Sequence, residues 1–224
     1  MHAAGQAKLP ARTGLKLSNM TLALTRTIDW LAVAYATLYF PVPVYWLLIH
    51  PAVNTWRRIG YRSFWIALPV WILIGAPLWL MEGSLFAHRL PRNAATYSLG
   101  AALLAWNLWI SHRVHQEFSF KKLAGLPELN PEHPLRGVVG TGIYARVRHP
   151  RYANIILGFM AFGLLTGSWG IFLLAIVSFL MYLIVTPLEE RELREQYGAD
   201  YEAYARAVPR FFPRFRRTSR NSSL

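Results

Sequence analysis

Two short charged segments of the sequence carry the residue types that could do chemistry. The first, residues 142–152, reads GIYARVRHPRY and places three arginines, a histidine and two tyrosines before an apolar stretch. The second is Glu189-Glu190, which follows the next apolar stretch and Pro187. Taken singly, the first is typical of a basic membrane-surface patch and the second of acids in the first turn of a helix. Together they offer both signs of charge beside aromatic rings.

A tight connection predicts that these two segments meet. Residues 152–166 and 171–187 are apolar and are joined by an uncharged Gly-Ser-Trp-Gly turn, which predicts an antiparallel helical hairpin. The outer ends of a hairpin lie on one face, so we expect Arg148 and His149 to lie near the two glutamates. Carboxylates at an apolar boundary are costly unless they are paired with a cation. The sequence therefore predicts a pocket that suits a zwitterionic cofactor and a lipid-like substrate.

The composition places this pocket in a membrane protein. Of 224 residues, 54% are hydrophobic and only 16% are charged, and the basic residues lie between the apolar stretches. A net charge of +13 would suggest nucleic acid in a soluble protein, but this distribution is the one that an anionic membrane surface favours. We therefore expect the lipid bilayer as a partner and no nucleic acid. The absence of cysteine excludes disulfides, thiolate metal sites and cysteine nucleophiles.

The predicted fold is an all-α integral membrane protein with about five transmembrane helices and a C-terminal cytoplasmic amphipathic helix. Prolines at positions 41 and 43 predict a kink or break in the first span. The three N-terminal spans are expected at residues 28–49, 64–81 and 94–110. The expected segments are 1–27 (N-terminal), 28–110 (three spans), 111–151 (cytoplasmic loop), 152–187 (hairpin), 188–213 (interfacial helix) and 214–224 (basic tail).

The basic residues also predict the orientation. Five spans place the two termini on opposite sides, and 18 of the 24 lysines and arginines fall on the side of the long loop and the C-terminus. Because basic residues concentrate on the cytoplasmic side, we expect a cytoplasmic C-terminus and an external N-terminus. The expected location is a multi-pass protein of a bacterial inner membrane or an equivalent cytosol-facing membrane.

Two weaker patterns suggest sites that we do not favour. The glycine-rich residues 137–142 resemble a phosphate-binding loop only loosely, because a strand–turn–helix context is missing, and a flexible loop is favoured. His112, His115 and Glu117 follow the third span and could cluster. A solvated helix end is favoured for these three residues, so no metal site is predicted.

An ordered block of motifs resembles the isoprenylcysteine carboxyl methyltransferase family, and the related phospholipid methyltransferases share part of it. The first three spans show no motif of their own, and the resemblance covers roughly residues 137–213. The block consists of residues 142–152, the hairpin, Glu189-Glu190, YGADYEAY at 197–204 and VPRFFP at 208–213.

The resemblance implies an S-adenosyl-L-methionine-dependent methyltransferase built of membrane helices, without a Rossmann domain. In this family the Arg-His-Pro segment and the paired glutamates help to enclose the cofactor, and Arg148 and His149 are the implied catalytic residues. Asn154 departs from the family, which often has glycine there, and this puts a close helix approach in question. The implied cofactor-binding residues are Tyr144, Arg148, His149, Pro150, Tyr152, Glu189 and Glu190.

The implied chemistry is in-line attack of a nucleophile on a sulfonium methyl group, which a low-dielectric, well-aligned pocket favours. A carboxylate acceptor needs no base, whereas an amine or phenol does, and His149 or a glutamate could serve. The expected acceptor is a hydrophobic or prenylated lipid-like substrate, although small hydrophobic molecules also fit. The alternatives are an NADPH-dependent membrane reductase of the sterol-reductase type, which is usually much longer, and a non-enzymatic membrane protein.

The predicted C-terminal helix carries a one-sided aromatic stripe. Leu193, Tyr197, Tyr201 and Tyr204 lie mostly on one side, with charged residues around them. We expect this helix to lie along the cytoplasmic face and close over the cofactor. A plain membrane-surface helix is the alternative.

Overall fold

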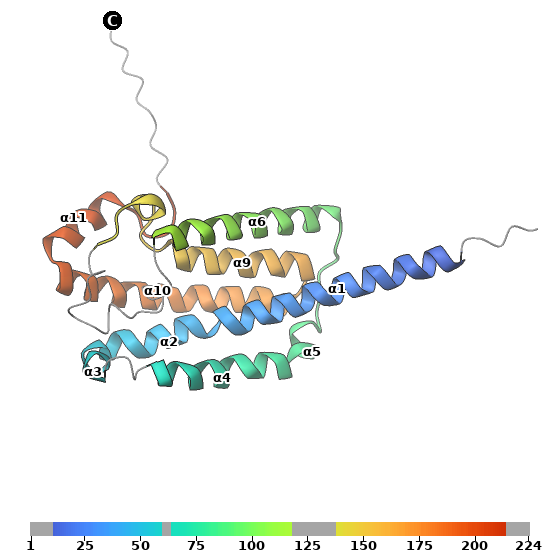
Figure 1. Cartoon of the computed structure of the whole chain (residues 1–224), viewed down its shortest axis with the longest axis horizontal. Coiled ribbons are helices and arrows are strands. Elements are labelled where there is room, and N and C mark those ends of the chain that lie inside the picture. The colour runs from blue at the N-terminus through green and yellow to red at the C-terminus, as the bar shows by residue number, and fades with distance from the viewer. Residues whose placement is uncertain (1–10, 60–63, 118–137, 214–224) are drawn as a thin grey trace, which may run out of the picture.

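A computed structural model of the chain describes residues 11–59, 64–117 and 138–213. Within these ranges all the regular secondary-structure elements are helices (Figure 1). This agrees with the predicted all-α class. The helices are α1 (Ala11–Tyr39), α2 (Pro41–Ile49), α3 (Val53–Ile59), α4 (Phe64–Leu80), α5 (Glu82–Leu85), α6 (Ala94–Glu117), α9 (Pro150–Thr166), α10 (Trp169–Tyr197) and α11 (Ala199–Ala207), with short 3-10 turns η1 (His50–Ala52) and η3 (Gly142–Ala145).

Helix α9 lies at the centre of the bundle, against α6, α10 and α1 (Figure 1). Two glycines on it permit this packing. A side chain at position 158 would collide with the Tyr35 hydroxyl and Asn107, and one at position 163 would collide with the ring of Phe172. The small residues therefore let large neighbours approach the backbone of α9, as they do in other membrane bundles.

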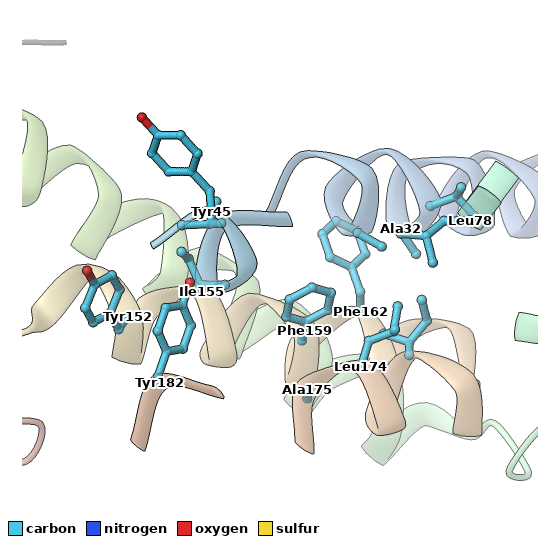
Figure 2. Close-up of a cluster of buried hydrophobic side chains, with 14 of the residues drawn as sticks. Ala32, Tyr45, Leu78, Tyr152, Ile155, Phe159, Phe162, Leu174, Ala175 and Tyr182 are labelled. Atoms are coloured by element: carbon cyan, nitrogen blue, oxygen red, sulfur yellow. The ribbon is translucent and has the colours of Figure 1, made fainter. Parts of the chain in front are cut away.

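The core follows this central helix. Figure 2 shows Ile155 and Phe159 of α9 between residues of α1, α2 and α10, among them Ala32 and Tyr182. Phe159 is fully buried. The bundle is therefore held by apolar packing along its length, and the charged groups gather at its two ends.

The position where the family often has glycine is a polar link between two helices. Asn107 of α6 donates from its amide to the backbone oxygen of Asn154, at 2.7 Å, and to its side-chain oxygen, at 3.0 Å. Asn154 in turn donates to the Ser111 hydroxyl at 2.8 Å. Both asparagines are buried. Asn154 thus joins α6 to α9 through hydrogen bonds.

The hairpin is confirmed, but its second helix is longer than predicted. Helix α10 does not end at Pro187; it continues to Tyr197, so the prediction of a separate helix beginning at residue 188 is wrong. Proline removes one backbone N–H, yet apolar helices tolerate it where neighbours compensate. Thr186 donates to the Tyr182 carbonyl at 2.8 Å and supports the turn before the proline. The chain bends only at Gly198, which has φ +52°.

The N-terminal half also differs from the prediction in its boundaries. Helix α1 begins at Ala11 instead of residue 28, and α6 continues past residue 110 to Glu117. The helix of the first span is interrupted at Phe40, directly before Pro41, as the two prolines predicted. Both helices thus extend through polar residues beyond the apolar spans that the sequence predicted, where the sequence carries no local signal for a helix end.

Two helical stretches within the described ranges are long and apolar enough to cross a membrane, Asn19–Trp56 and Trp169–Tyr197. The segment Leu68–Leu80 is apolar but shorter. The predicted count of five spans is therefore not confirmed, although the six helices α1, α2, α4, α6, α9 and α10 run along one bundle axis (Figure 1).

An ion pair closes one end of the bundle. Arg89, which follows α5, donates to both carboxylate oxygens of Asp29 at 2.9 and 2.8 Å and to the Thr166 carbonyl at 3.2 Å. Nearby, the turn between α9 and α10 is formed by Gly167, with φ +69°, and by Ser168, whose hydroxyl accepts from the Ile171 N–H. These contacts fix the angle at which α9 and α10 meet.

Candidate functional site

The other end of the bundle brings the two predicted charged segments together. Arg148 and His149 precede α9, and Glu190 lies on the C-terminal part of α10. Arg148 donates to Glu190 from Nε at 3.1 Å and from Nη2 at 2.8 Å. The Nε2 atom of His149 lies 3.2 Å from the same carboxylate. The proximity predicted from the hairpin is therefore present in the structure.

Glu190 is the centre of this cluster. Its side chain is 0% exposed, and two further cations reach it from residues that the sequence reasoning did not assign to the site. Arg210 donates to both carboxylate oxygens at 2.9 and 2.8 Å, and Arg194 lies 3.5 Å away. A carboxylate held by three arginines and a histidine is already satisfied, so Glu190 organises the site from within.

The C-terminal segment closes over Arg148. The Nη1 atom of Arg148 donates to the carbonyls of Ala205, at 2.7 Å, and Val208. The backbone N–H groups of Arg148 and His149 donate to the Pro209 and Arg210 carbonyls at 2.8 and 2.9 Å. The segment after α10 is therefore tied to the start of α9 by main-chain and side-chain hydrogen bonds together.

The adjacent Glu189 is in a different state. Its Oε2 atom lies 3.4 Å from Nδ1 of His149, an ion-pair distance, yet this buried oxygen has no hydrogen-bond donor. The side chain as a whole is 28% exposed, but this oxygen is buried. Glu189 can therefore accept a further hydrogen bond, whereas the oxygens of Glu190 already have donors.

A run of aromatic rings leads from the cluster into the bundle. The His149 ring lies parallel to the Tyr152 ring at 5.5 Å, and Tyr152 stacks on Tyr182 at 4.3 Å (Figure 2). Phe211 tilts against the outer side of His149 at 5.9 Å. Buried aromatic faces exclude water and attract cations. The site thus combines a carboxylate oxygen of Glu189 that has no hydrogen-bond donor with a row of stacked aromatic rings.

The electrostatics of the cluster favour a charged histidine and a neutral tyrosine. Burial works to lower the pKa of His149, but the carboxylates of Glu189 and Glu190 outweigh it and raise this pKa above its ordinary value. Burial raises the pKa of Tyr144, so its hydroxyl keeps its proton at neutral pH. His149 is therefore already occupied as a cation partner of the glutamates.

All the predicted site residues lie at this end of the molecule. Tyr144, His149, Pro150, Tyr152 and Glu190 are buried. Arg148 and Glu189 are half-buried. The structure describes their positions, while their cofactor-binding and catalytic roles stay predictions.

Several partners were missed because their signals are weak in the sequence. Arg210 lies in the VPRFFP motif, so its position could have marked it. Arg194 looked like an ordinary charge on an exposed helix. His50 lies far away in the chain, and it pairs with Glu192 at 2.9 Å beside the cluster. Charge pairs between distant segments leave no local pattern.

The two weaker patterns of the sequence take other positions. His112 and His115 are exposed on α6, where they contact Gln116 and the Ser111 carbonyl. Glu117 accepts from the Thr141 hydroxyl at 2.6 Å and so ties α6 to η3. No cluster of three metal-ligating side chains occurs in the part of the chain that the structure describes. The loop 125–136 lies outside the described residues.

Comparison with known proteins supports the family resemblance. A family model described as phospholipid methyltransferase matches residues 95–200, which run from α6 into α11. This confirms the resemblance at the level of the related phospholipid methyltransferases. The narrower isoprenylcysteine assignment is not tested by this match.

Two relatives share the name methanethiol S-methyltransferase. The chain is 32% identical over 156 residues to a methanethiol S-methyltransferase of Pseudomonas deceptionensis, covering 69% of the chain and 55% of the relative. It is 28% identical over 155 residues to methanethiol S-methyltransferase 2 of Bradyrhizobium diazoefficiens, covering 67% and 54%. The chain thus spans about half the length of these relatives.

A third relative matches a shorter region. The cobalt-zinc-cadmium resistance protein CzcN of Cupriavidus metallidurans is 37% identical over 78 residues, covering 34% of the chain and 36% of the relative.

Proposed function

We propose that this chain, whose residues 95–200 match the phospholipid methyltransferase family, is an integral membrane methyltransferase that uses S-adenosyl-L-methionine. The observation that carries the proposal is the buried Oε2 atom of Glu189, which has no hydrogen-bond donor and whose ion pair with His149 is long, at 3.4 Å. A buried carboxylate oxygen without a donor carries a free-energy cost, and a bound cation or N–H donor removes that cost. The printed activity of two relatives agrees with methyl transfer.

The residues present fit a sulfonium cofactor. Besides the Glu189 oxygen, the hydroxyls of Tyr182 and Tyr201 are buried without a hydrogen-bond partner. These groups can receive the ammonium, hydroxyl or amino groups of the cofactor, and the tyrosine faces suit its positive sulfur. When bound, the cofactor supplies an electrophilic methyl group.

The other charged residues hold this arrangement. Glu190 fixes His149 and Arg148, and His149 in turn orients Glu189. Arg148 has its donors engaged by Glu190 and by the carbonyls of the C-terminal segment, so we assign it a positioning role. The segment from α11 to Arg210 is hydrogen-bonded to Arg148 and His149 and holds them next to Glu190.

We propose an apolar acceptor. The expectation from the sequence was a lipid-like or prenylated substrate. Two relatives are methanethiol S-methyltransferases, so a small thiol is a second class of acceptor to consider. Both classes suit an aromatic site at the end of an apolar bundle, and they differ in size and in the nucleophile.

Binding and turnover can be measured on the detergent-purified chain. S-Adenosylhomocysteine is titrated calorimetrically, with NADPH as the competing ligand. Transfer of labelled methyl to methanethiol, farnesylcysteine and phosphatidylethanolamine is then compared. Binding of S-adenosylhomocysteine with transfer to one acceptor supports the proposal. Binding of NADPH alone would favour a reductase, and binding of neither would reject an enzyme of both kinds.

We also propose that the charged cluster faces the cytoplasm. The basis is the excess of basic residues at that end. Because the chain has no cysteine, an introduced thiol is unique. Glu195→Cys lies near the cluster and Ser84→Cys at the opposite end, and both positions are exposed. An impermeant thiol reagent added to intact cells is expected to label position 84 and spare 195; the reverse would invert the orientation.

A further inference from the structure

A second histidine–glutamate pair lies beside the proposed cofactor site. His50, at the end of α2, places Nδ1 2.9 Å from Oε2 of Glu192 on α10. Both side chains are buried, with 4% and 9% exposure. The Trp46 ring stacks on the His50 ring at 5.0 Å and an interplanar angle of 18°. The imidazole is therefore held in one orientation from two sides.

The other ring nitrogen of His50 is unused. Its Nε2 atom is buried and has no hydrogen-bond partner. A carboxylate only accepts hydrogen bonds, so Nδ1 carries the proton that faces Glu192. In the neutral ring Nε2 is then a free proton acceptor. A buried acceptor without a donor carries a free-energy cost that a protic ligand would remove.

This acceptor belongs to the surroundings of the proposed site. Glu189 and Glu192 lie three residues apart on α10, which places them on the same face of the helix. A positive charge on His50 would attract the Glu189 carboxylate. Among the described residues, Glu192, at 2.9 Å from the ring, and Glu189 are the acidic groups that interact with His50.

We infer that His50 is the general base that deprotonates the methyl acceptor, and that the acceptor is a protic nucleophile such as a thiol instead of a carboxylate. This inference rests on the proposed function. The S–H proton moves to Nε2 of His50, and the sulfur forms the new bond to the methyl carbon. The carbon–sulfonium bond breaks, and its electron pair goes to the departing neutral sulfur. The proton on His50 then returns to solvent.

The contrast with His149 gives this assignment its physical reason. Both ring nitrogens of His149 face glutamates, and these carboxylates raise its pKa. A histidine whose two ring nitrogens both face carboxylates has no ring nitrogen free to take a proton from a substrate. His50 is paired on one side only. We therefore assign the base function to His50 instead of to His149 or a glutamate, the candidates that the sequence offered.

The test compares His50→Gln with the control His112→Gln, an exposed histidine of α6. S-Adenosylhomocysteine affinity is measured first, to show that each variant folds and keeps the cofactor site. Methyl transfer to ethanethiol and to farnesylcysteine is then measured. We expect His50→Gln to lower the ethanethiol rate about a hundredfold, while His112→Gln leaves it unchanged.

A second readout needs no turnover. Ethanethiol is added to the complex with S-adenosylhomocysteine, and the ultraviolet absorbance of the thiolate is recorded at neutral pH. The wild-type chain and His112→Gln are expected to form thiolate, and His50→Gln is not. Glu192→Gln keeps a hydrogen bond to the ring but removes the charge, and we expect a loss of about tenfold in rate.

The outcomes separate the two proposals. A wild-type chain that binds no S-adenosylhomocysteine overturns both. A wild-type chain that binds it and methylates ethanethiol, with His50→Gln equally fast and equally able to form thiolate, overturns only the role of His50. Transfer to farnesylcysteine alone, unaffected by His50→Gln, has the same consequence, since a carboxylate has no proton to lose. If His50→Gln does not fold, an unchanged rate in Glu192→Gln decides against the base.

Discussion

Two buried charge clusters at opposite ends of one bundle use their charges differently. At one end Asp29 and Arg89 form a bidentate pair, and Arg89 also donates hydrogen bonds to the carbonyls of Thr166 and Phe86. At the other end Glu190 is saturated, but the neighbouring Glu189 keeps an oxygen without a donor. Both carboxylate oxygens of Asp29 thus have donors, whereas the glutamate cluster contains a carboxylate oxygen that can still accept a hydrogen bond.

The difference indicates which cluster serves the fold and which serves a ligand. A fully hydrogen-bonded ion pair gains nothing from a ligand, whereas a buried carboxylate oxygen without a hydrogen-bond donor gains a partner when a cation binds. The two ends should therefore respond differently to substitution. The Asp29 end should affect stability alone, and the glutamate end should affect both stability and ligand affinity.

The largest effect is expected for Glu190→Ala. The substitution leaves Arg148, which is 10% exposed, without its buried counter-ion, and we expect a loss of about 3–5 kcal/mol of unfolding free energy. Thermal unfolding in detergent measures it. Glu195→Gln, in an exposed pair with Arg191 at 3.8 Å, is the control and should change little. Equal stability of the two variants would show that the cluster does not hold the fold.

A smaller loss is expected for Asp29→Ala. Arg89 loses two charge-assisted hydrogen bonds but can turn toward solvent, so we expect a loss of about 1.5–3 kcal/mol. Unfolding in detergent measures the loss, and calorimetric titration should show unchanged affinity for S-adenosylhomocysteine. A weakened affinity would contradict the separation of the two ends.

The reverse pattern is expected for Glu189→Gln. Its Oε2 atom has no hydrogen bond to lose and only a 3.4 Å ion pair with His149, so the loss of stability should be smaller than for Glu190→Ala. Affinity for S-adenosylhomocysteine should fall about tenfold, or about 1.4 kcal/mol, because the cofactor loses a charged partner. Calorimetric titration and thermal unfolding are measured on the same preparation. A variant with lower stability and normal affinity would assign Glu189 to the fold.

The smallest effect concerns pH. The pKa of His149 is raised above its ordinary value of 6.5, because the two glutamates outweigh burial. A raised pKa means that His149 contributes stability fully below its unfolded pKa, and that this contribution is lost as pH rises through the folded value. The melting temperature of the wild-type chain should therefore approach that of His149→Gln as pH increases. A difference that does not depend on pH would show that the protonated ring is not what stabilises the cluster.

The sequence predicted the elements whose signals are local. The Gly-Ser-Trp-Gly turn fixed the hairpin, because Gly167 takes a positive φ and Ser168 caps the next helix. The hairpin then required Arg148 and Glu190 to lie on one face. Apolar stretches likewise indicated the helices, since burial of apolar side chains is a property of composition.

Helix ends were predicted less well, because tertiary contacts decide them. Pro187 is a local signal for an end, yet α10 continues past it. The next turns of this helix carry Glu190 and Glu192, which are bound by Arg148 and His50. These distant partners stabilise a helix that the local sequence would end.

The sequence alone thus determined a helical, basic, cysteine-free chain with a hairpin, an Arg-His-Pro segment and a glutamate pair. Only the tertiary structure decided which glutamate has all its oxygens hydrogen-bonded and which keeps an oxygen without a donor. It also decided that His50, at the far end of the first span, pairs with Glu192. The physical reason is that an ion pair depends on the distance between atoms, and residues 142 positions apart come within 2.9 Å only after the bundle has packed.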